Sequence, residues 1–346
     1  MSVYFLPDFH VVHVGYNALN KSRDDLFRIY TDLGFSPLLD EIVTLDNRKV
    51  RYFGKNTEIL GDYVDKVLKA LDEKCHAGDF LFMDFPFAIK FLGFSKIVSY
   101  AKALGIKVIF FIHDLDGVRF QLPFVNMSDS ACLDLCHCMI SASEAMDECL
   151  LKTLKVSPRI KKVNYQYWDY LCKDEINEKN SARICFAGNL AKSTFLAKIP
   201  PKLLEGGIHL YGKGMAKNYK GEFCGEYTPE DLVDVLDGKW GLVWDGKSQR
   251  TCTGNYGKYL KINASHKFGL YMATDKPVIV WNKSPISLFV KEHNIGICVS
   301  SLEEAAKILD RISEAAFEEM KRNILSIRKE VITGYHLKKV ILESMK

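Results

Sequence analysis

The stretch HKFGLYMATDKPVIVW, residues 266–281, places a short apolar helix directly before an apolar strand that a proline introduces. A strand in which apolar residues follow one another is typical of a parallel sheet that helices cover on both faces. The helix begins with His266 and Lys267, and a lysine in the first turn opposes the positive end of the helix dipole. We therefore interpret Lys267 either as a solvated surface residue or as a ligand for an anion at the helix start.

Strands and helices alternate on both sides of this stretch. In the first half, the pattern predicts them in turn over SVYFL, NKSRDDLFRIYTDLG, PLLDEIVTL, TEILGDYVDKVLKALDEK, DFLFMDFP, FSKIVSYAKALG, KVIFFIHDL and CHCMISAS. The alternation restarts at Arg183 with RICFAG, GIHLYG, a helix after TPEDL, KWGLVW, PISLFVKEH, IGICVS and SLEEAAKILDRI. Such repetition predicts α/β architecture with parallel sheets.

The alternation stops where NYQYWDYLCKDEINEKNS is first aromatic and then charged. We therefore expect two α/β domains of similar size that face each other. Their predicted limits are 1–163 for the N-terminal domain, 164–182 for a connection, 183–326 for the C-terminal domain, and 327–346 for a terminal helix that packs back on the first domain. Ligands of open parallel sheets bind beyond the carboxyl ends of the strands, so a cleft between the domains is the expected site.

Composition narrows the classes of protein. The 346 residues carry a net charge of +4, which weighs against nucleic-acid binding and suits an anionic substrate. The start, MSVYFLPDFH, has no export signal, and the apolar runs are interrupted, so we expect a cytoplasmic protein. Most of the ten cysteines lie in apolar runs, and we expect them to be reduced. The spacing of cysteine and histidine in CLDLCHCMI does not fit a zinc site, so we expect no metal ligands.

Several polar residues follow predicted strands of the second domain. In FAGNLAKSTF, Gly188 allows a ligand close to the backbone, and Asn189 and Lys192 then lie where they can contact a phosphate, although an ordinary turn explains the same pattern. The segment is neither GxGxxG nor a P-loop. Tyr227 stands just before a helix that starts at TPEDL, with a ring that can contact a base or a phosphate.

A further strand end, WGLVWDG, carries Asp245 and leads into the polar loop SQRTCTGNYGKYLKIN, which contains Thr253. Long polar loops at sheet ends usually have a function, so we expect Asp245 and this loop to shape a pocket. In the first domain, IHDLD places His113, Asp114 and Asp116 at the end of a strand. They are read as a cation-binding DxD, as a general base, or as an acidic turn.

The chain resembles a known family in several of these segments. The region from Trp240 to Trp281, with FAGNL, IHDLD and MDFPFAIK, is similar to bacterial β-1,6-galactofuranosyltransferases of O-antigen synthesis. A more distant resemblance is to streptococcal glucosyltransferases that extend O-linked GlcNAc on adhesins. These are glycosyltransferases of GT-B architecture, with two facing Rossmann-like domains, so the resemblance implies that fold and a UDP-sugar donor.

The resemblance also assigns roles to residues. It implies that Lys267 holds the donor diphosphate, that Tyr227 contacts the donor, and that Lys192 replaces an arginine beside the diphosphate. Asn20 and Lys21 would line the acceptor side. His266 is grouped with the donor residues because it precedes Lys267. The resemblance implies that neither a metal nor another cofactor takes part.

The resemblance implies an inverting, metal-independent transfer of galactofuranose from UDP-galactofuranose to a sugar hydroxyl of a lipid-linked glycan precursor, as in lipopolysaccharide and polysaccharide synthesis. Inversion by direct displacement requires one base, and Asp114 or Asp116 is the candidate. Two alternatives stay open: a UDP-glucose-dependent glucosyltransferase acting on GlcNAc, and a non-catalytic subunit that binds a nucleotide sugar. Peripheral membrane contact through the basic segments MKRNILSIRK and YHLKKVILESMK, and a homo-oligomer, are further hypotheses.

Overall fold

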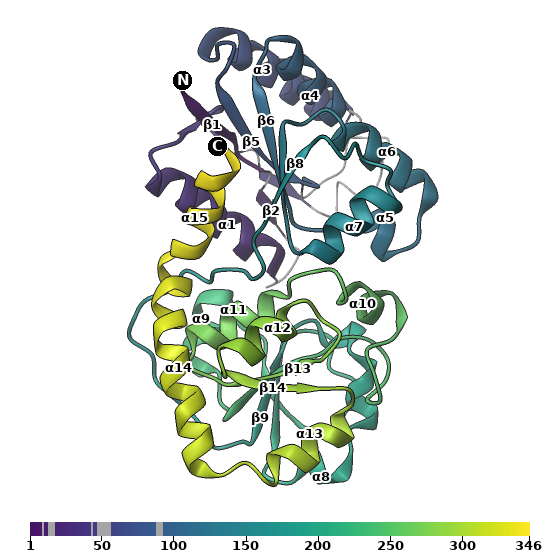
Figure 1. The fold of residues 1–346 in the computed structure, drawn as a ribbon, viewed down its shortest axis with the longest axis vertical. Helices are drawn as coiled ribbons and strands as arrows, with labels where there is room; N and C mark the ends of the chain where they lie inside the picture. Colours follow the sequence, from purple (N-terminus) through teal and green to yellow (C-terminus); the bar gives the residue numbers. More distant parts are fainter. Residues whose placement is uncertain (9, 13–17, 43, 47–56, 88–92) are drawn as a thin grey trace. The chain divides into compact units, whose positions relative to one another are not determined.

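The computed structural model describes residues 1–8, 10–12, 18–42, 44–46, 57–87 and 93–346. Residue 43 of the predicted strand region PLLDEIVTL and residues 88–90 of MDFPFAIK lie outside the described residues. The chain divides into two compact units: residues 1–15, 19–165 and 337–346 form the first, and residues 16–18 and 166–336 form the second (Figure 1).

The first unit contains a six-stranded parallel sheet in the order β3-β1-β5-β6-β7-β8. Its strands are β1 (Val3–Leu6), β3 (Ser36–Pro37), β5 (Phe80–Phe85), β6 (Lys107–Ile112), β7 (Cys138–Ser141) and β8 (Lys161–Asn164). Two short strands, β2 (His10–Val12) and β4 (Thr44–Asp46), pair separately. The helices are α1 (Ala18–Asp32), α3 (Thr57–Lys74), α4 (Gly93–Ala103), α5 (Asp116–Arg119), α6 (Pro123–Leu133), α7 (Glu144–Lys152) and α15 (Tyr335–Ser344).

The second unit repeats this architecture with the order β11-β10-β9-β12-β13-β14, again parallel throughout. Its strands are β9 (Ile184–Ala187), β10 (Ile208–Tyr211), β11 (Glu222–Gly225), β12 (Trp240–Val243), β13 (Val278–Trp281) and β14 (Gly296–Val299). Its helices are η1 (Leu190–Lys192), η2 (Thr194–Lys198), α8 (Pro201–Leu204), α9 (Pro229–Val235), α10 (Gly254–Tyr259), α11 (His266–Ala273), α12 (Ile286–Glu292), α13 (Leu302–Leu309) and α14 (Glu314–Thr333).

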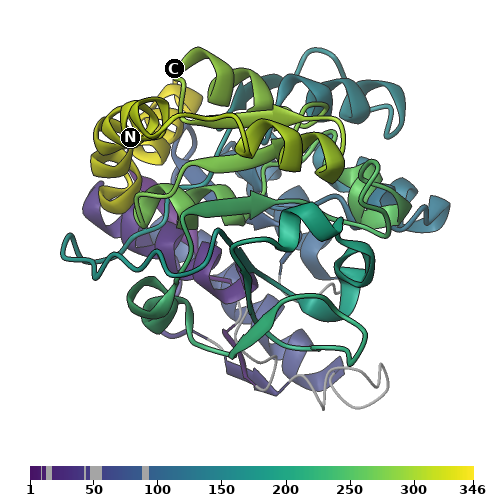
Figure 2. The same ribbon diagram turned by 90° about the horizontal axis from the view of Figure 1, so that it is seen from below.

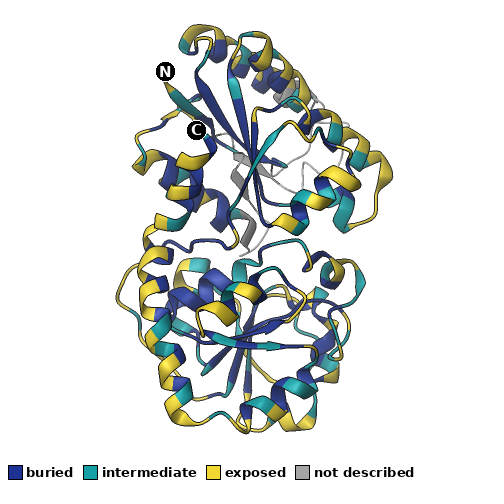
Figure 3. Ribbon diagram, in the orientation of Figure 1, coloured by how far each residue is buried: buried dark blue, intermediate teal, exposed yellow. Residues whose placement is uncertain are grey.

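The strands of the second sheet other than the edge strand β11 contribute to two apolar cores. In β9, Ile184 and Phe186 pack on one face, whereas Cys185 and Ala187 pack on the other. Strands β12 and β13 are buried along their whole length, and buried residues are dark blue in Figure 3. Helices lie on both sides of the sheet, as Figure 2 shows. Successive side chains of a strand point to opposite faces, so covering both faces requires the apolar runs that the sequence contains. The predicted fold class, α/β with two parallel sheets, is confirmed.

Two segments at the ends of the second unit have clear neighbours. The aromatic start of the predicted connection lies in this unit, because Tyr167 and Tyr170 join its core. The last helix, α15, belongs from Leu337 on to the first unit, where Lys338 Nζ lies 2.8 Å from Asp32 of α1.

The helices described include none with both the length and the apolarity needed to cross a membrane. The ten cysteines are free thiols.

Candidate functional site

Gly188, Asp245 and Lys267 meet at the carboxyl ends of β9 and β12. Gly188 directly follows β9, Asp245 lies two residues beyond β12, and Lys267 is in the first turn of α11. Lys267 Nζ donates a hydrogen bond to Asp245 Oδ2 at 3.1 Å, and both side chains are only 13% exposed. The ammonium group also lies 5.4 Å from the centre of the Phe186 ring. The lysine that the sequence places against the helix dipole is therefore held at the strand ends by a carboxylate.

Because Gly188 has no side chain, the stem of Lys267 can lie against it. A Cβ atom at this position would lie 3.1 Å from Lys267 Cε, closer than such contacts normally come. The backbone of Gly188 donates to Tyr211 O, so the glycine is fixed by the sheet while the lysine stem crosses it. Gly188 and Lys267, which the sequence predicts separately, are therefore in direct contact.

Tyr271 fixes the start of α11 relative to these strands. Its hydroxyl accepts from Ala187 N at 3.1 Å and lies 3.3 Å from Leu242 O, so it bridges β9 and β12. The ring fits because residue 241 is glycine: a Cβ there would lie 2.2 Å from Tyr271 Cγ. Buried hydroxyls with several partners rigidify their surroundings. Gly241, Tyr271 and the strand ends thus hold Lys267 on a rigid support.

Asp245 has one oxygen that the Lys267 contact does not use. Among the described residues, Asp245 Oδ1 is buried and has no hydrogen-bond partner. Buried polar atoms without partners are rare and commonly face a ligand or water. Thr253 closes the loop next to it, because a Cβ on Gly246 would lie 2.1 Å from Thr253 O. Thr253 precedes α10 without using its side chain as a cap, which leaves its hydroxyl available to the loop.

His266 is packed rather than directed outward. Its ring stacks on Trp168 at 5.0 Å between centroids and meets the edge of Tyr170 at 6.0 Å. Both aromatic residues come from the segment that the sequence predicts as a connection. The two polar residues at the start of α11 therefore have different neighbours. His266 packs against the aromatic residues of the predicted connection, and Lys267 lies at the ends of β9 and β12.

The remaining donor candidates have separate contacts. Lys192, at the end of η1, places Nζ 4.4 Å from the centre of the Tyr256 ring in α10. Asn189 is exposed and precedes η1. Tyr227 packs its ring over Gly225 and donates from its hydroxyl to Cys224 O at 3.0 Å. Lys192 and Tyr227 are thus held near the strand ends by aromatic and backbone contacts, respectively.

The first unit also gathers charged residues at the carboxyl ends of its strands. His113 follows β6, and its Nε2 lies 2.9 Å from Asp84 Oδ1 near the end of β5. Its Nδ1 lies 3.3 Å from Ser22 Oγ in the first turns of α1. Arg23, the next residue, pairs with Asp8 and donates to Pro86 O at 2.8 Å. These groups are buried, so both ring nitrogens of His113 are engaged inside the unit.

Asp114 and Asp116 share one partner, Arg119. An Arg119 guanidinium nitrogen lies 2.8 Å from Asp114 Oδ2 and 2.5 Å from Asp116 Oδ1. Burial raises the pKa of Asp114 above its usual value, and the Arg119 charge opposes this shift. Asp116 is the first residue of α5, where an acid stabilises the helix start. The two acids of IHDLD therefore differ in the structure. Burial raises the pKa of Asp114, which makes its carboxylate a stronger base, whereas Asp116 stabilises the start of α5.

The predicted acceptor-side residues lie in α1. Lys21 forms an ion pair with Asp25 at 2.7 Å, and both side chains are 2% exposed. Asn20, one residue earlier, is half-buried. Sequence reasoning missed Asp84, Ser22 and Arg23. A signal existed for Asp84, because an aspartate within the apolar run FLFMDF must be buried and paired.

Comparison with solved structures identifies the fold. The structure of Anabaena Alr3699/HepE in complex with UDP-glucose matches 100% of this chain, and 99% of that chain, with a TM-score of 0.62 and 11% sequence identity. The fold is GT-B, with two Rossmann-like domains. Parallel sheets of this kind commonly bind ligands at the carboxyl ends of the strands, where the candidate residues of both units lie. The chain therefore has the fold of the GT-B glycosyltransferases.

The family follows from the sequence. The glucosyltransferase 3-like N-terminal domain matches residues 10–160, and the C-terminal domain of the same family matches residues 184–344. The chain belongs to the glucosyltransferase 3-like family.

Two curated relatives are similar over most of the chain. The β-1,6-galactofuranosyltransferase WbbI of Escherichia coli K12 is 28% identical over 77% of this chain and 78% of its own. Glucosyltransferase 3 of Streptococcus gordonii is 25% identical over 72% of this chain and 73% of its own. The resemblance that the sequence segments indicate is thus confirmed.

Proposed function

We propose that this glycosyltransferase transfers galactofuranose from UDP-galactofuranose to a sugar hydroxyl of a lipid-linked glycan precursor, with inversion at the anomeric carbon. The observation that carries the proposal is Lys267, held in the first turn of α11 beside Gly188 at the ends of β9 and β12. The similarity to WbbI supports galactofuranose, and the UDP-glucose complex of HepE supports a UDP donor for this fold.

Lys267 is placed to neutralise the donor diphosphate. The first turn of α11 offers backbone N–H groups and the positive end of its dipole, and the ammonium group adds a full charge. When the bond between the anomeric carbon and UDP breaks, negative charge builds on the leaving oxygen, and these groups stabilise it. Lys192, with Nζ over the Tyr256 ring, supplies a second positive charge in the same unit. This chemistry requires no metal in the proposed reaction.

Asp114 is the proposed base. It accepts the proton of the acceptor hydroxyl while that oxygen bonds to the anomeric carbon and UDP departs with the electrons of the broken bond. A carboxylate whose pKa is raised by burial is a stronger base than an ordinary aspartate. His113 is a positioning residue, because its contacts to Asp84 and Ser22 fix the segment that carries Asp114.

The donor is tested directly. Purified protein is incubated with UDP-galactofuranose or UDP-glucose and a panel of synthetic lipid-linked disaccharides, and products are measured by mass spectrometry. We expect a mass increase of one hexose with UDP-galactofuranose, and a furanoside by NMR. Product from UDP-glucose alone would instead support the glucosyltransferase alternative, which the S. gordonii relative favours. UDP binding without product from either donor would support the non-catalytic subunit.

Gly188 provides a test of the donor site. We expect Gly188→Ala to weaken UDP binding about tenfold. The added methyl group displaces Lys267 and so weakens its proposed charge-assisted hydrogen bond to the diphosphate of UDP. The affinity is measured by isothermal titration calorimetry. Gly61→Ala is the matched control, since a Cβ at that helical position meets nothing within 4 Å. Equal UDP affinity of wild type and Gly188→Ala would contradict this placement of the diphosphate.

Membrane contact through the basic C-terminal segments stays a hypothesis, and three cations of these segments have partners within the chain. Arg328 donates to Ala273 O at 3.0 Å and pairs with Asp174, Lys321 pairs with Glu178, and Lys338 pairs with Asp32. These three cations are therefore engaged within the chain.

A further inference from the structure

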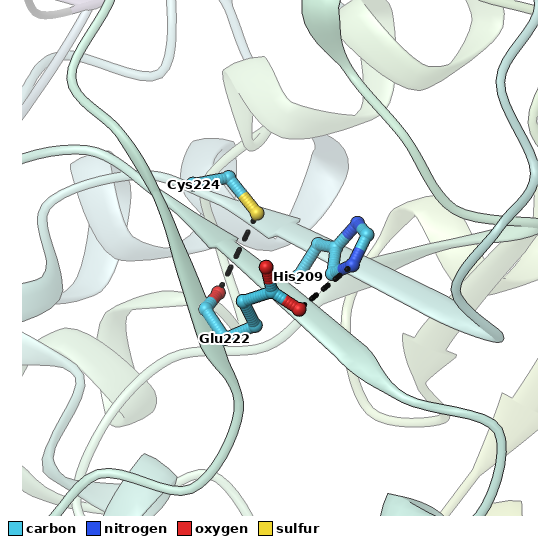
Figure 4. A group of neighbouring side chains, drawn as sticks. All are labelled: His209, Glu222 and Cys224. Carbon is cyan, nitrogen blue, oxygen red and sulfur yellow. Dashed lines mark hydrogen bonds and ion pairs between the residues drawn. The ribbon is translucent and has the colours of Figure 1, made fainter.

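Three side chains with metal-binding donors converge on strands β10 and β11, as Figure 4 shows. His209 on β10 is opposite Glu222 on β11, and Cys224 follows two residues later on the same strand. Their donor atoms all lie within 4.8 Å of one another, and His209 Nε2 is 3.6 Å from Glu222 Oε2. Residues two apart on a strand point to the same face, which places Glu222 and Cys224 side by side.

Cys224 also lies at a bulge in β11. Leu210 pairs with Phe223, but the next residue, Tyr211, pairs with Gly225, so Cys224 is the extra residue of the strand. Gly225 has a φ of 119°, a conformation that favours glycine. Bulges redirect a side chain and are frequent beside functional sites. The bulge is not needed to form an edge strand, so it supports a functional role for Cys224.

The second ring nitrogen of His209 is already anchored. Nδ1 lies 3.2 Å from Asp237 O and 3.7 Å from Asp237 Oδ2. Asp237 is itself fixed, because its carboxylate accepts from Ser181 N at 2.7 Å. When Nδ1 donates to the Asp237 carbonyl, the lone pair lies on Nε2, which faces Glu222. Histidines that bind metals are oriented by such a contact to a carbonyl or carboxylate.

We propose that His209, Glu222 and Cys224 bind one Zn²⁺ ion, with water as the fourth ligand. An imidazole nitrogen, a thiolate and a carboxylate oxygen form a donor set that suits zinc. Zinc bonds of about 2.0–2.3 Å require the donor atoms to approach within about 4 Å of one another. The Glu222 side chain is 76% exposed and can change rotamer to complete this contraction. Binding releases the Cys224 thiol proton to solvent.

The ion would stabilise the edge of the second sheet rather than take part in transfer. β11 is the last strand of the sheet; Gly221 precedes it and Gly225 ends it, both with left-handed φ angles. Tyr227, a proposed donor contact, donates to the carbonyl of Cys224 at 3.0 Å. An ion on Cys224 would therefore also hold Tyr227. This site differs from the expectation of no metal ligands, which rested on the spacing of other cysteines.

The test is metal binding by the full chain without an affinity tag. Protein treated with a chelator and exchanged into chelator-free buffer is titrated with Zn²⁺ and, separately, with Co²⁺ as a spectroscopic probe. We expect one equivalent of Zn²⁺ to bind, the melting temperature to rise, and Co²⁺ to give a thiolate-to-cobalt absorption band. Cys224→Ser should abolish the band, and His209→Asn should weaken binding at least tenfold.

Cys298→Ser is the matched control, because Cys298 is another half-buried free thiol of the same unit. It should keep the band and the stoichiometry. Far-UV circular dichroism without metal verifies that each variant is folded. The proposal is overturned if the wild type binds no stoichiometric ion, or if Cys224→Ser and Cys298→Ser give the same cobalt spectrum. Because UDP binding is not the readout, this result is independent of the proposed transfer reaction.

Discussion

A protein with Lys267→Met and Asp245→Asn together is expected to stay folded and to bind UDP about 10- to 100-fold more weakly than the wild type. This range corresponds to the loss of one hydrogen bond between charged groups. Methionine keeps an unbranched stem that crosses Gly188 and packs against Phe186, while it removes the ammonium group. Isothermal titration calorimetry with UDP measures the affinity, and thermal unfolding reports the fold.

The double substitution is needed because Lys267 and Asp245 depend on each other. Both side chains are 13% exposed, so Lys267→Ala alone would leave a largely buried carboxylate without its counter-charge. Breaking buried pairs in this way costs about 3–5 kcal/mol of stability, which would mask an effect on binding. Asparagine at position 245 removes that charge.

Two comparison variants make the result specific. Lys261→Met removes an exposed lysine of the same segment and should bind UDP as the wild type does. Asp245→Asn alone frees Lys267 from its carboxylate and should bind UDP at least as tightly. If the double variant binds UDP with wild-type affinity, Lys267 is only a structural partner of Asp245, and the proposed donor site is wrong.

The sequence located Lys267 correctly at the start of a helix, because local features decide that position. A polar residue before an apolar helix, followed by a proline-led strand, is a short-range pattern. Its partner could not be predicted in the same way. Asp245 lies 22 residues earlier, and only the pairing of β12 beside β9 brings both strand ends to one place. The sequence therefore predicted both residues as site candidates but not the ion pair between them.

The same limit applies to the first unit. His113 was predicted as a candidate, but its partners Asp84 and Ser22 lie 29 and 91 residues away. They meet because β5 is adjacent to β6 and α1 begins at the same edge, and strand order cannot be read from apolar periodicity. The contact of His266 with Trp168 was not predicted either, because Trp168 belongs to a segment that the pattern treated as a connection. The assignment of His266 to the donor site stays a prediction.

Asp114→Asn is expected to lower kcat by about 10²- to 10⁴-fold, the usual contribution of a general base, with little change in UDP affinity. Asparagine has the same shape as aspartate and can still bond Arg119, so the fold should be retained. Asp116→Asn is the matched control: it changes an acid bonded to the same arginine and should affect kcat much less. Transfer is followed by UDP release with saturating acceptor.

The pH dependence identifies the base more sharply than the loss of rate. A base acts when deprotonated, and burial raises the pKa of Asp114, so kcat/KM should fall on the acidic side at a higher pH than an ordinary aspartate would cause. The charge of Arg119 opposes this shift; Arg119→Gln should therefore move the acidic limb to still higher pH. Asp114→Asn should remove the limb from the residual activity. A limb that stays in place in both variants belongs to another group, and His113, held between Asp84 and Ser22, would then be the residue to test as the base.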